Sequence, residues 1–398
     1  MNTNEIFDLD RKYIASTYGR LPLAPAYGKN ATLYDCDGKE YIDFTAGIGV
    51  NSLGIAPAEW SDAVYAQLNK IQHISNYYFS EPTSILAKKL VEASGAKKVI
   101  FQNSGGEANE VAIKVARKYS FDKYCAGRHK IITLVNSFHG RTITTLAATG
   151  QDVFHNFFFP FTEGFAYVPA NDLDALKKEL DGTVCAIMCE VLQGEGGVNV
   201  LDAEYIGAIK EICENNDILL IFDEVQTGIA RTGEIFAHQH YSVTPDVFTL
   251  AKGLGGGLPI GACVLGEKCE KVFTPGDHGT TFGGNPAVCA GANVVLDTVG
   301  KKDFLDSVKE KGDYIKSNIN GWNLSCVKEV RGLGLMLGIE VTVPHKEAVK
   351  KCLGSGLMML TAGKNVLRML PPLTITYEEI DKGLAILKDV LSEYEINA

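Results

Sequence analysis

Short apolar runs rich in Val, Ile and Phe alternate with amphipathic stretches between about residue 95 and residue 265. Strands that alternate with helices in this way are typical of a mainly parallel sheet covered on both faces. The pattern therefore predicts an α/β fold with a doubly wound sheet. Six runs are expected to be its strands: Lys97–Phe101, Lys130–Val135, Cys185–Val191, Ile218–Val225, Val247–Ala251 and Gly261–Leu265.

Helical periodicity fills the gaps between these runs. It is clearest in Gly106–Ser120 and in Ala203–Asn216, and each helix is expected to lie against the sheet with its apolar face. In the first segment that face consists of Ala108, Val111, Ala112, Val115 and Ala116.

The two ends of the chain differ from this middle region. Strand pieces in Val327–Val341, a helix candidate in His345–Gly356 and a closing amphipathic helix in Thr376–Glu395 predict a smaller α+β unit. Near the start, Ala31–Phe44 has the pattern of a hairpin that turns at the Asp-Gly pair of residues 37 and 38. We expect this hairpin to pack with the C-terminal unit.

Size and charge narrow the architecture and the partners. With 398 residues the chain exceeds the length of a single core, so we expect an N-terminal segment (1–60), a large domain (61–290) and a small C-terminal domain (291–398). A net charge of −10, with no run of Lys and Arg longer than a pair, argues against nucleic acid or an anionic membrane as a partner. The polar, acidic start and the lack of an apolar window of ~18 residues predict a cytoplasmic protein.

Cysteine and histidine spacing indicates neither a disulfide framework nor a metal site. The ten cysteines are scattered without a C-x-x-C pair, which is typical of reduced, mostly buried thiols. His238 and His240 are two residues apart, and the H-E-x-x-H pattern is absent. We expect no bound metal.

The residues that follow each predicted strand are the candidates for chemistry, because ligands of open parallel sheets collect where the strands end. After the first strand, Ser104, Gly105 and Gly106 lead directly into a helix whose first N–H groups are unpaired and partly positive. Two glycines let an anion approach the backbone. The structural alternative is an N-cap in which Ser104 and Glu107 form a capping box.

Two carboxylates and a lysine follow two later strands. Asp223 and Glu224 end one apolar run, and Lys252 ends the next one along the chain. Since these strands are expected to be parallel, Asp223 and Lys252 should lie on the same edge of the sheet. The structural alternatives are solvated carboxylates and a simple ion pair between Lys252 and Asp223.

A lysine, an acid and a glycine-opened helix on one edge match the needs of pyridoxal phosphate. Its phosphate needs amide donors, its pyridine nitrogen needs an anion and its aldehyde needs an amine. Burial disfavours charged lysine, which frees the amine of Lys252 for this bond. A dinucleotide site is disfavoured, because the stretches that begin at Gly253 and Gly332 carry Leu258 and Leu337 where G-x-G-x-x-G needs its last glycine.

Six motifs in one order extend this interpretation: FQNSGGEANEVAIKVAR, SFHGRT, LQGEGGV, FDEVQTGIARTG, LAKGLGGGLPIGA and HGTTFGGNP. Together they resemble the class III, fold-type I pyridoxal-phosphate aminotransferases, and most closely the acetylornithine aminotransferases among them. The resemblance covers nearly the whole chain. It implies a large domain with a mainly parallel sheet and a smaller α+β domain built from both chain ends.

The resemblance assigns roles around the cofactor. It implies that Lys252 holds pyridoxal phosphate covalently, that Asp223 pairs with the pyridine nitrogen and that Gln226 contacts the ring hydroxyl. Phe138 is implied to stack on the ring, and Thr281 to reach the phosphate of a neighbouring subunit, so a homodimer with shared active sites is expected. The remaining implied cofactor contacts are the phosphate-binding amides of Gly105 and Gly106, and Glu224 and Val225.

The substrates are also implied by the resemblance. Arg141, with Thr280 beside it, is implied to receive the α-carboxylate of N2-acetyl-L-ornithine. Arg368 resembles the arginine that binds the α-carboxylate of 2-oxoglutarate, and Glu195 the carboxylate that masks this arginine while the ω-amine donor is bound. The products would be N-acetyl-L-glutamate 5-semialdehyde and L-glutamate, a step of arginine biosynthesis. Surface ion pairs and a loop charge are the structural alternatives.

Two stretches depart from the family pattern. The usual SGAEAN is SGGEAN here, which should matter little because backbone amides do the binding. The usual glycine-histidine-x-histidine-proline is replaced by GIAPAEW, so the substrate entrance is expected to be rearranged. Succinyl-diaminopimelate, succinylornithine, ornithine and 4-aminobutyrate aminotransferases are the alternatives within the class, and a non-catalytic regulator that binds pyridoxal phosphate is the alternative outside it.

Overall fold

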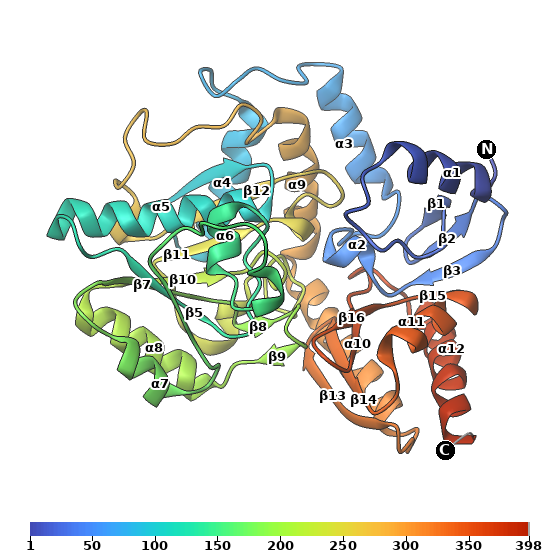
Figure 1. Ribbon diagram of the computed structural model, residues 1–398. Coiled ribbons are helices and arrows are strands. Elements are labelled where there is room, and N and C mark those ends of the chain that lie inside the picture. Colours follow the sequence, from blue (N-terminus) through green and yellow to red (C-terminus); the bar gives the residue numbers. More distant parts are fainter. Residues whose placement is uncertain (397–398) are drawn as a thin grey trace.

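The computed structural model describes residues 1–396, and a seven-stranded sheet forms the core of its larger part (Figure 1). Neighbouring strands pair in parallel from β11 to β6, whereas β12 runs antiparallel to both β11 and β4. The mainly parallel sheet and its six predicted strands are confirmed. The order is β4-β12-β11-β10-β7-β5-β6, with bounds Lys98–Gln102, Gly261–Leu265, Val247–Leu250, Leu219–Asp223, Val184–Cys189, Lys130–Leu134 and Phe165–Val168.

Both faces of this sheet are buried, as its apolar runs predict. Along β10, Leu219 and Ile221 belong to one core cluster, whereas Leu220 and Phe222 belong to another. Successive residues of a strand point to opposite faces, so a strand buried on both sides must be apolar at every position. The only charged residue of β10 is therefore its last one, Asp223, which is buried as well.

Helices cover the two faces. In α5 (Gly105–Tyr124) the five apolar residues predicted for its inner face are all buried. On the other face, α8 (Ala203–Asn216) buries Ile206 and Ile209. The other helices of this region are α3 (Ala58–Leu68), α4 (Glu81–Ser94), α6 (Ile143–Ala148), α7 (Leu173–Glu179) and α9 (Pro286–Val299).

The C-terminal part forms the predicted α+β unit. Its antiparallel sheet has the order β13-β14-β17-β16, with bounds Val327–Leu333, Met336–Val341, Val366–Met369 and Leu360–Ala362. The accompanying helices are α10 (Lys302–Asn320), α11 (His345–Gly354) and α12 (Tyr377–Ile396).

The N-terminal hairpin packs with this unit, as predicted (Figure 1). Its turn forms because Asp35 accepts the N–H groups of Asp37 and Lys39, each at 2.9 Å, while Gly38 takes a φ of +86°. The last strand of the hairpin pairs in parallel with β15 (Leu357–Met358). The N-terminal strands are β1 (Pro25–Lys29), β2 (Thr32–Asp35) and β3 (Glu40–Asp43).

The remaining elements are short or lie at the surface. No helix within residues 1–396 combines the length and the apolar character needed to cross a bilayer. Eight of the ten cysteines are buried, which confirms that these thiols are mostly internal. The elements not yet named are α1 (Thr3–Tyr13), α2 (Ala46–Gly49), β8 (Leu192–Gln193), β9 (Asn199–Val200) and the 3₁₀ helices η1 (Asp152–Phe154), η2 (Ala237–Tyr241), η3 (Lys252–Leu254) and η4 (Glu267–Cys269).

Candidate active site

A cavity of about 410 Å³ lies at the edge of the main sheet where β4, β10 and β11 end. Asp223 is the last residue of β10, and Lys252 follows closely on the end of β11, which pairs in parallel with β10. The predicted shared edge is therefore confirmed. The predicted site residues that line the cavity are Gly105, Gly106, Phe138, Glu195, Asp223, Val225, Gln226 and Lys252.

The start of α5 forms one wall of the cavity. The Ser104 hydroxyl caps the helix by accepting the N–H of Glu107 at 3.2 Å, so the predicted N-cap is confirmed. The capping box is not formed, because the Glu107 carboxylate accepts the N–H of Asn103 at 2.6 Å instead of that of Ser104. Capping still leaves the first-turn amides of Gly105 and Gly106 without partners inside the helix. A Cβ on Gly105 would lie 2.6 Å from a Val225 methyl, whereas one on Gly106 would meet nothing closer than 3.8 Å. The close packing of Val225 therefore requires glycine at position 105, whereas position 106 has room for alanine.

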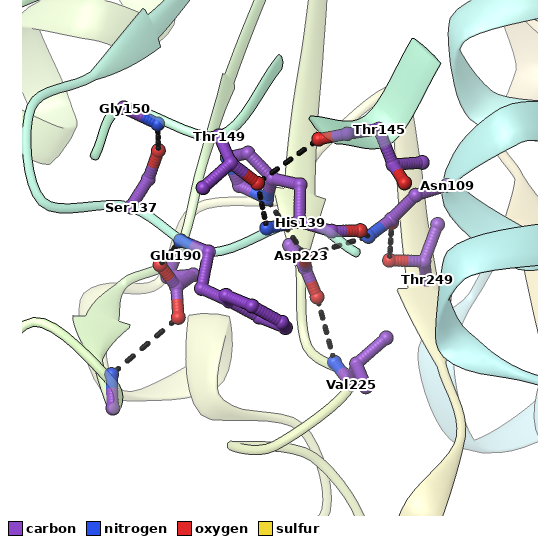
Figure 2. Close-up of polar contacts among 12 residues, drawn as sticks. Asn109, Ser137, His139, Thr145, Thr149, Gly150, Glu190, Asp223, Val225 and Thr249 are labelled. Carbon is purple, nitrogen blue, oxygen red and sulfur yellow. Dashed lines mark hydrogen bonds and ion pairs between the residues drawn. The ribbon is translucent and has the colours of Figure 1, made fainter. Parts of the chain in front are cut away.

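Asp223 is buried and held by three hydrogen bonds (Figure 2). Its Oδ2 accepts His139 Nδ1 and Asn109 Nδ2, both at 2.8 Å, and its Oδ1 accepts the N–H of Val225 at 3.0 Å. Asn109 is fixed in turn, because its Oδ1 accepts the Thr249 hydroxyl at 2.7 Å. The network orients the carboxylate and leaves Oδ1 with further capacity to accept a proton donor from the cavity.

Lys252 lies in a backbone conformation that is rare for a side chain of its size. Its φ is +41°, in the left-handed region, at the start of η3. Burial of the amine, which outweighs the raising effect of the Glu195 charge, lowers the pKa of Lys252 to about 8. A substantial fraction of neutral amine is therefore present near pH 8, as bond formation and proton transfer require.

The GIAPAEW stretch, which departs from the family pattern, packs against the glycines that follow Lys252. Trp60 Nε1 donates to the Gly255 carbonyl at 3.1 Å. A Cβ on Gly256 would lie 2.9 Å from the same nitrogen. The rearranged segment thus supports the loop that continues into the cavity wall at Gly257.

A bidentate ion pair joins Glu195, which lines the cavity, to Arg368, which does not. The guanidinium nitrogens of Arg368 donate to the two Glu195 oxygens at 2.7 and 3.1 Å, and one of them also donates to Gln226 Oε1 at 3.2 Å. Burial would raise the pKa of Glu195, but the charge and the hydrogen bonds of Arg368 outweigh it, so this pKa lies below its ordinary value. Arg368 does not itself line the cavity, because Glu195 and Gln226 stand before it.

Arg141 lies beside the cavity in a different setting. It follows Gly140, which lines the cavity, but its side chain is exposed. Its guanidinium carbon lies 3.9 Å from the ring centroid of Phe154 and 5.4 Å from that of Phe138. Within residues 1–396 no carboxylate lies within ion-pair distance of Arg141.

Three other predicted residues are not brought to this cavity. The Glu224 carboxylate is buried and accepts the N–H groups of Ala237 and His238 at 2.6 and 2.8 Å. Thr280 accepts Asn103 Nδ2 at 3.1 Å. Thr281 lines a second cavity, of about 210 Å³.

Among the cavity residues without a role predicted from the sequence, three polar ones make contacts with Asp223 or Phe138. Asn109 and His139 fix Asp223, and Glu190 accepts the Phe138 N–H at 3.0 Å. Burial, and then the charge of Asp223, raise the pKa of Glu190 well above its ordinary value, which favours a neutral acid beside Asp223. One signal was available: Asn109 is a polar residue next to the apolar face predicted for α5.

Comparisons with known proteins find relatives that match nearly the whole chain. The family model described as Aminotransferase class-III matches residues 13–391. An acetylornithine aminotransferase of Haemophilus ducreyi is 52% identical over 99% of this chain and 100% of its own length. Another, from Caldanaerobacter subterraneus, is 50% identical over 96% of this chain and 98% of its own.

Solved structures show the same fold. The ornithine aminotransferase of Toxoplasma gondii, described with partial occupancy of PLP at its active site, has a TM-score of 0.94 at 32% identity and covers 99% of this chain and 95% of its own. The N-acetylornithine aminotransferase of Stenotrophomonas maltophilia has a TM-score of 0.86 at 34% identity and covers 98% and 100%.

Proposed function

Because the chain belongs to the class III aminotransferases, we propose that it uses pyridoxal phosphate to transfer the ω-amino group of N2-acetyl-L-ornithine to 2-oxoglutarate. The observation that carries this proposal is the closed pair between Glu195 and Arg368. With Arg368 neutralised, the reacting end of the cavity suits a donor that has no carboxylate next to its amine, which is an ω-amine. The relatives named as acetylornithine aminotransferases supply the identity of that donor.

The residues around the cavity fit the cofactor. The unpaired amides of Gly105 and Gly106 suit a phosphate, and the lack of a Cβ at 105 lets the Val225 side chain pack against this helix start. The spare capacity of Asp223 Oδ1 suits a protonated ring nitrogen. Phe138 is proposed to cover one face of the ring. When bound, pyridoxal phosphate supplies an aldehyde carbon that takes up an amine and a ring that accepts electrons.

The chain's own groups then divide the work of proton transfer. Lys252 is proposed to hold the cofactor and, once displaced by the donor, to remove the proton from the carbon that bears the donor's amine. A pKa of about 8 suits both tasks near neutral pH. Asp223, oriented by His139 and Asn109, is proposed to keep the ring nitrogen protonated.

The two substrates use two arginines in this proposal. Arg141 receives the α-carboxylate at the far end of acetylornithine. Arg368 receives the α-carboxylate of 2-oxoglutarate after Glu195 has moved away from it. A planar guanidinium binds a carboxylate with two hydrogen bonds, so the substrate replaces the contacts that Glu195 gives up.

A homodimer and a cytoplasmic location belong to the same proposal. Tyr77, Phe79 and Phe282 are largely exposed beside the second cavity, which holds Thr281. An apolar surface of this kind suits a partner subunit, whose cofactor phosphate Thr281 would contact. Sedimentation at low concentration, with a Phe282→Glu variant, tests the dimer. The scattered free cysteines support a reducing compartment.

A donor comparison tests the function. The half-reaction is followed by the absorbance of the bound cofactor with acetylornithine, succinylornithine, ornithine and 4-aminobutyrate, each without an acceptor. The proposal expects the highest kcat/KM for acetylornithine. Ornithine is the second candidate, because ornithine aminotransferases are among the similar structures. A wide preference for any non-acylated donor would refute the proposal.

A further inference from the structure

The loop that carries Phe154 is held close to the segment that carries Arg141. The Gln151 side chain donates to the Ser137 carbonyl at 2.9 Å, next to Phe138. On the other side of Phe154, His155 Nε2 donates to the Leu146 carbonyl at 3.0 Å. These contacts fix the backbone on both sides of Phe154 relative to α6 and to the cavity wall.

Two aromatic rings form a corner at the place where this loop meets the cavity. Phe138 lines the cavity, and its ring meets that of Phe154 edge to face, with centroids 5.9 Å apart and an interplanar angle of 77°. The Arg141 guanidinium lies over both rings, closer to Phe154. A cation is attracted to the face of an aromatic ring at such distances.

An aromatic contact positions a cation without neutralising it. A carboxylate would occupy the N–H donors of the guanidinium, whereas a ring face leaves those in-plane donors free. A long exposed arginine otherwise samples many rotamers, and that freedom is lost when a ligand binds. The contact with Phe154 therefore keeps Arg141 near the cavity with its donors available.

We propose that Phe154 is a positioning residue for substrate, which holds Arg141 ready to receive the carboxylate at the far end of the amino donor. This inference rests on the proposed function, since it takes Arg141 as the carboxylate receptor. It adds a residue outside the motifs that carry the family resemblance, and it predicts that the aromatic ring itself matters, rather than apolar bulk.

Two donors that differ only in the carboxylate isolate this role. N-acetylputrescine is acetylornithine without its α-carboxylate, so the ratio of kcat/KM for acetylornithine to kcat/KM for N-acetylputrescine measures recognition of that group. Phe154→Leu is expected to lower this ratio about three- to tenfold. Phe154→Tyr, which keeps the ring, and Phe157→Leu, the same change at an exposed position of the same loop, should preserve it. A merely structural defect would slow both donors equally.

Equilibrium binding gives a readout that does not depend on turnover. N-acetyl-L-norvaline carries the carboxylate but no ω-amine, and calorimetry should show its Kd rising about three- to tenfold in Phe154→Leu. Thermal unfolding of each variant verifies that the fold is intact. An unchanged ratio and an unchanged Kd in Phe154→Leu, or an equal loss in Phe154→Tyr or Phe157→Leu, would overturn the inference.

Arg141→Gln separates this inference from its premise. If this variant leaves the donor ratio unchanged, Arg141 is not the carboxylate receptor and the proposed role of that residue fails together with the role of Phe154. If Arg141→Gln lowers the ratio and Phe154→Leu does not, the proposed function stands and the inference on Phe154 alone is wrong.

Discussion

The two arginines of the site have opposite surroundings. Arg368 is 3% exposed on β17 and is bound by a carboxylate of the same chain. Arg141 is exposed on a loop and rests on aromatic rings. A buried cation needs a partner, because the cost of removing it from water must be offset, whereas an exposed one remains hydrated. The fold therefore supplies Glu195 at one position and only ring faces at the other.

This difference separates a conditional site from a permanently available one. Arg368 can bind a substrate only after Glu195 leaves, so its availability depends on which substrate is present. Arg141 has no competing carboxylate within residues 1–396, so it can serve whenever a carboxylate arrives. A single cavity can thus treat a mono-carboxylate donor and a dicarboxylate acceptor differently.

The largest effect on the reaction rate should come from a change of Lys252. Carboxylate binding by the two arginines leads to transfer only if the Lys252 amine binds the cofactor and carries the proton. Lys252→Ala is expected to lower the rate of both half-reactions by about four orders of magnitude, because nucleophile and proton carrier are lost together. Pyridoxal phosphate should still bind through the phosphate and Asp223 contacts. Single-turnover absorbance measures the rate, and Lys271→Ala at a highly exposed lysine is the control. Near-wild-type turnover would remove Lys252 from its role.

The next effect tests the conditional site. Arg368→Gln should lower kcat/KM for 2-oxoglutarate about 100-fold, because truncating one partner of a buried charge pair has effects of that size. The acetylornithine half-reaction of the same variant serves as the internal control and should change less than about threefold. The Glu195 side chain is 30% exposed and can be hydrated, so the fold should survive. Equal losses in both half-reactions would show that the two arginines do not divide the substrates.

A smaller effect is expected when Glu195 is changed instead. Glu195→Gln removes the charge that holds Arg368, so amino acids with an α-carboxylate beside the reacting amine should be accepted more readily. The rate with L-glutamate relative to acetylornithine should rise about tenfold, which corresponds to about 1.4 kcal/mol. Stopped-flow absorbance with each donor measures this ratio. A ratio that stays constant would mean that Glu195 does not mask Arg368.

The sequence predicts the buried half of the site better than the exposed half. Asp223 and Lys252 could be placed on one edge because parallel neighbouring strands end together, a rule that needs only the strand pattern. The partners of Asp223 required the fold, since Asn109 and His139 are separated from it by 114 and 84 residues. The sequence pattern also does not predict that β12 runs antiparallel to its neighbours, because an apolar run is compatible with either strand direction.

Two side chains show where pattern reasoning stops. The sequence pattern predicts one role for Glu224 and Asp223, yet the two carboxylates diverge, since neighbouring residues at a strand end point to opposite sides. Phe154 carries no pattern of its own among the phenylalanines of residues 154–161. Its proposed role depends on contacts with Phe138 and Arg141, which only the folded chain provides.

The smallest expected effect distinguishes the two arginines by their influence on Lys252. Its pKa is lowered to about 8 by burial, while the Glu195 charge raises it and the Arg368 charge lowers it. Covalent attachment of pyridoxal phosphate to the apoenzyme needs the neutral amine, so its rate should rise with pH and level off above this pKa. The midpoint should move down in Glu195→Gln, move up in Arg368→Gln and stay in place in Arg141→Gln. Above pH about 8, and up to the ordinary lysine pKa, the unfolded chain binds the extra proton, so apoenzyme stability should also rise with pH there. Absorbance gives the rate of cofactor attachment and its pH midpoint in each variant, and borohydride fixation at residue 252 checks that the attachment is to Lys252. A midpoint that moved equally in both arginine variants would show that Arg141 is not insulated from the buried charges.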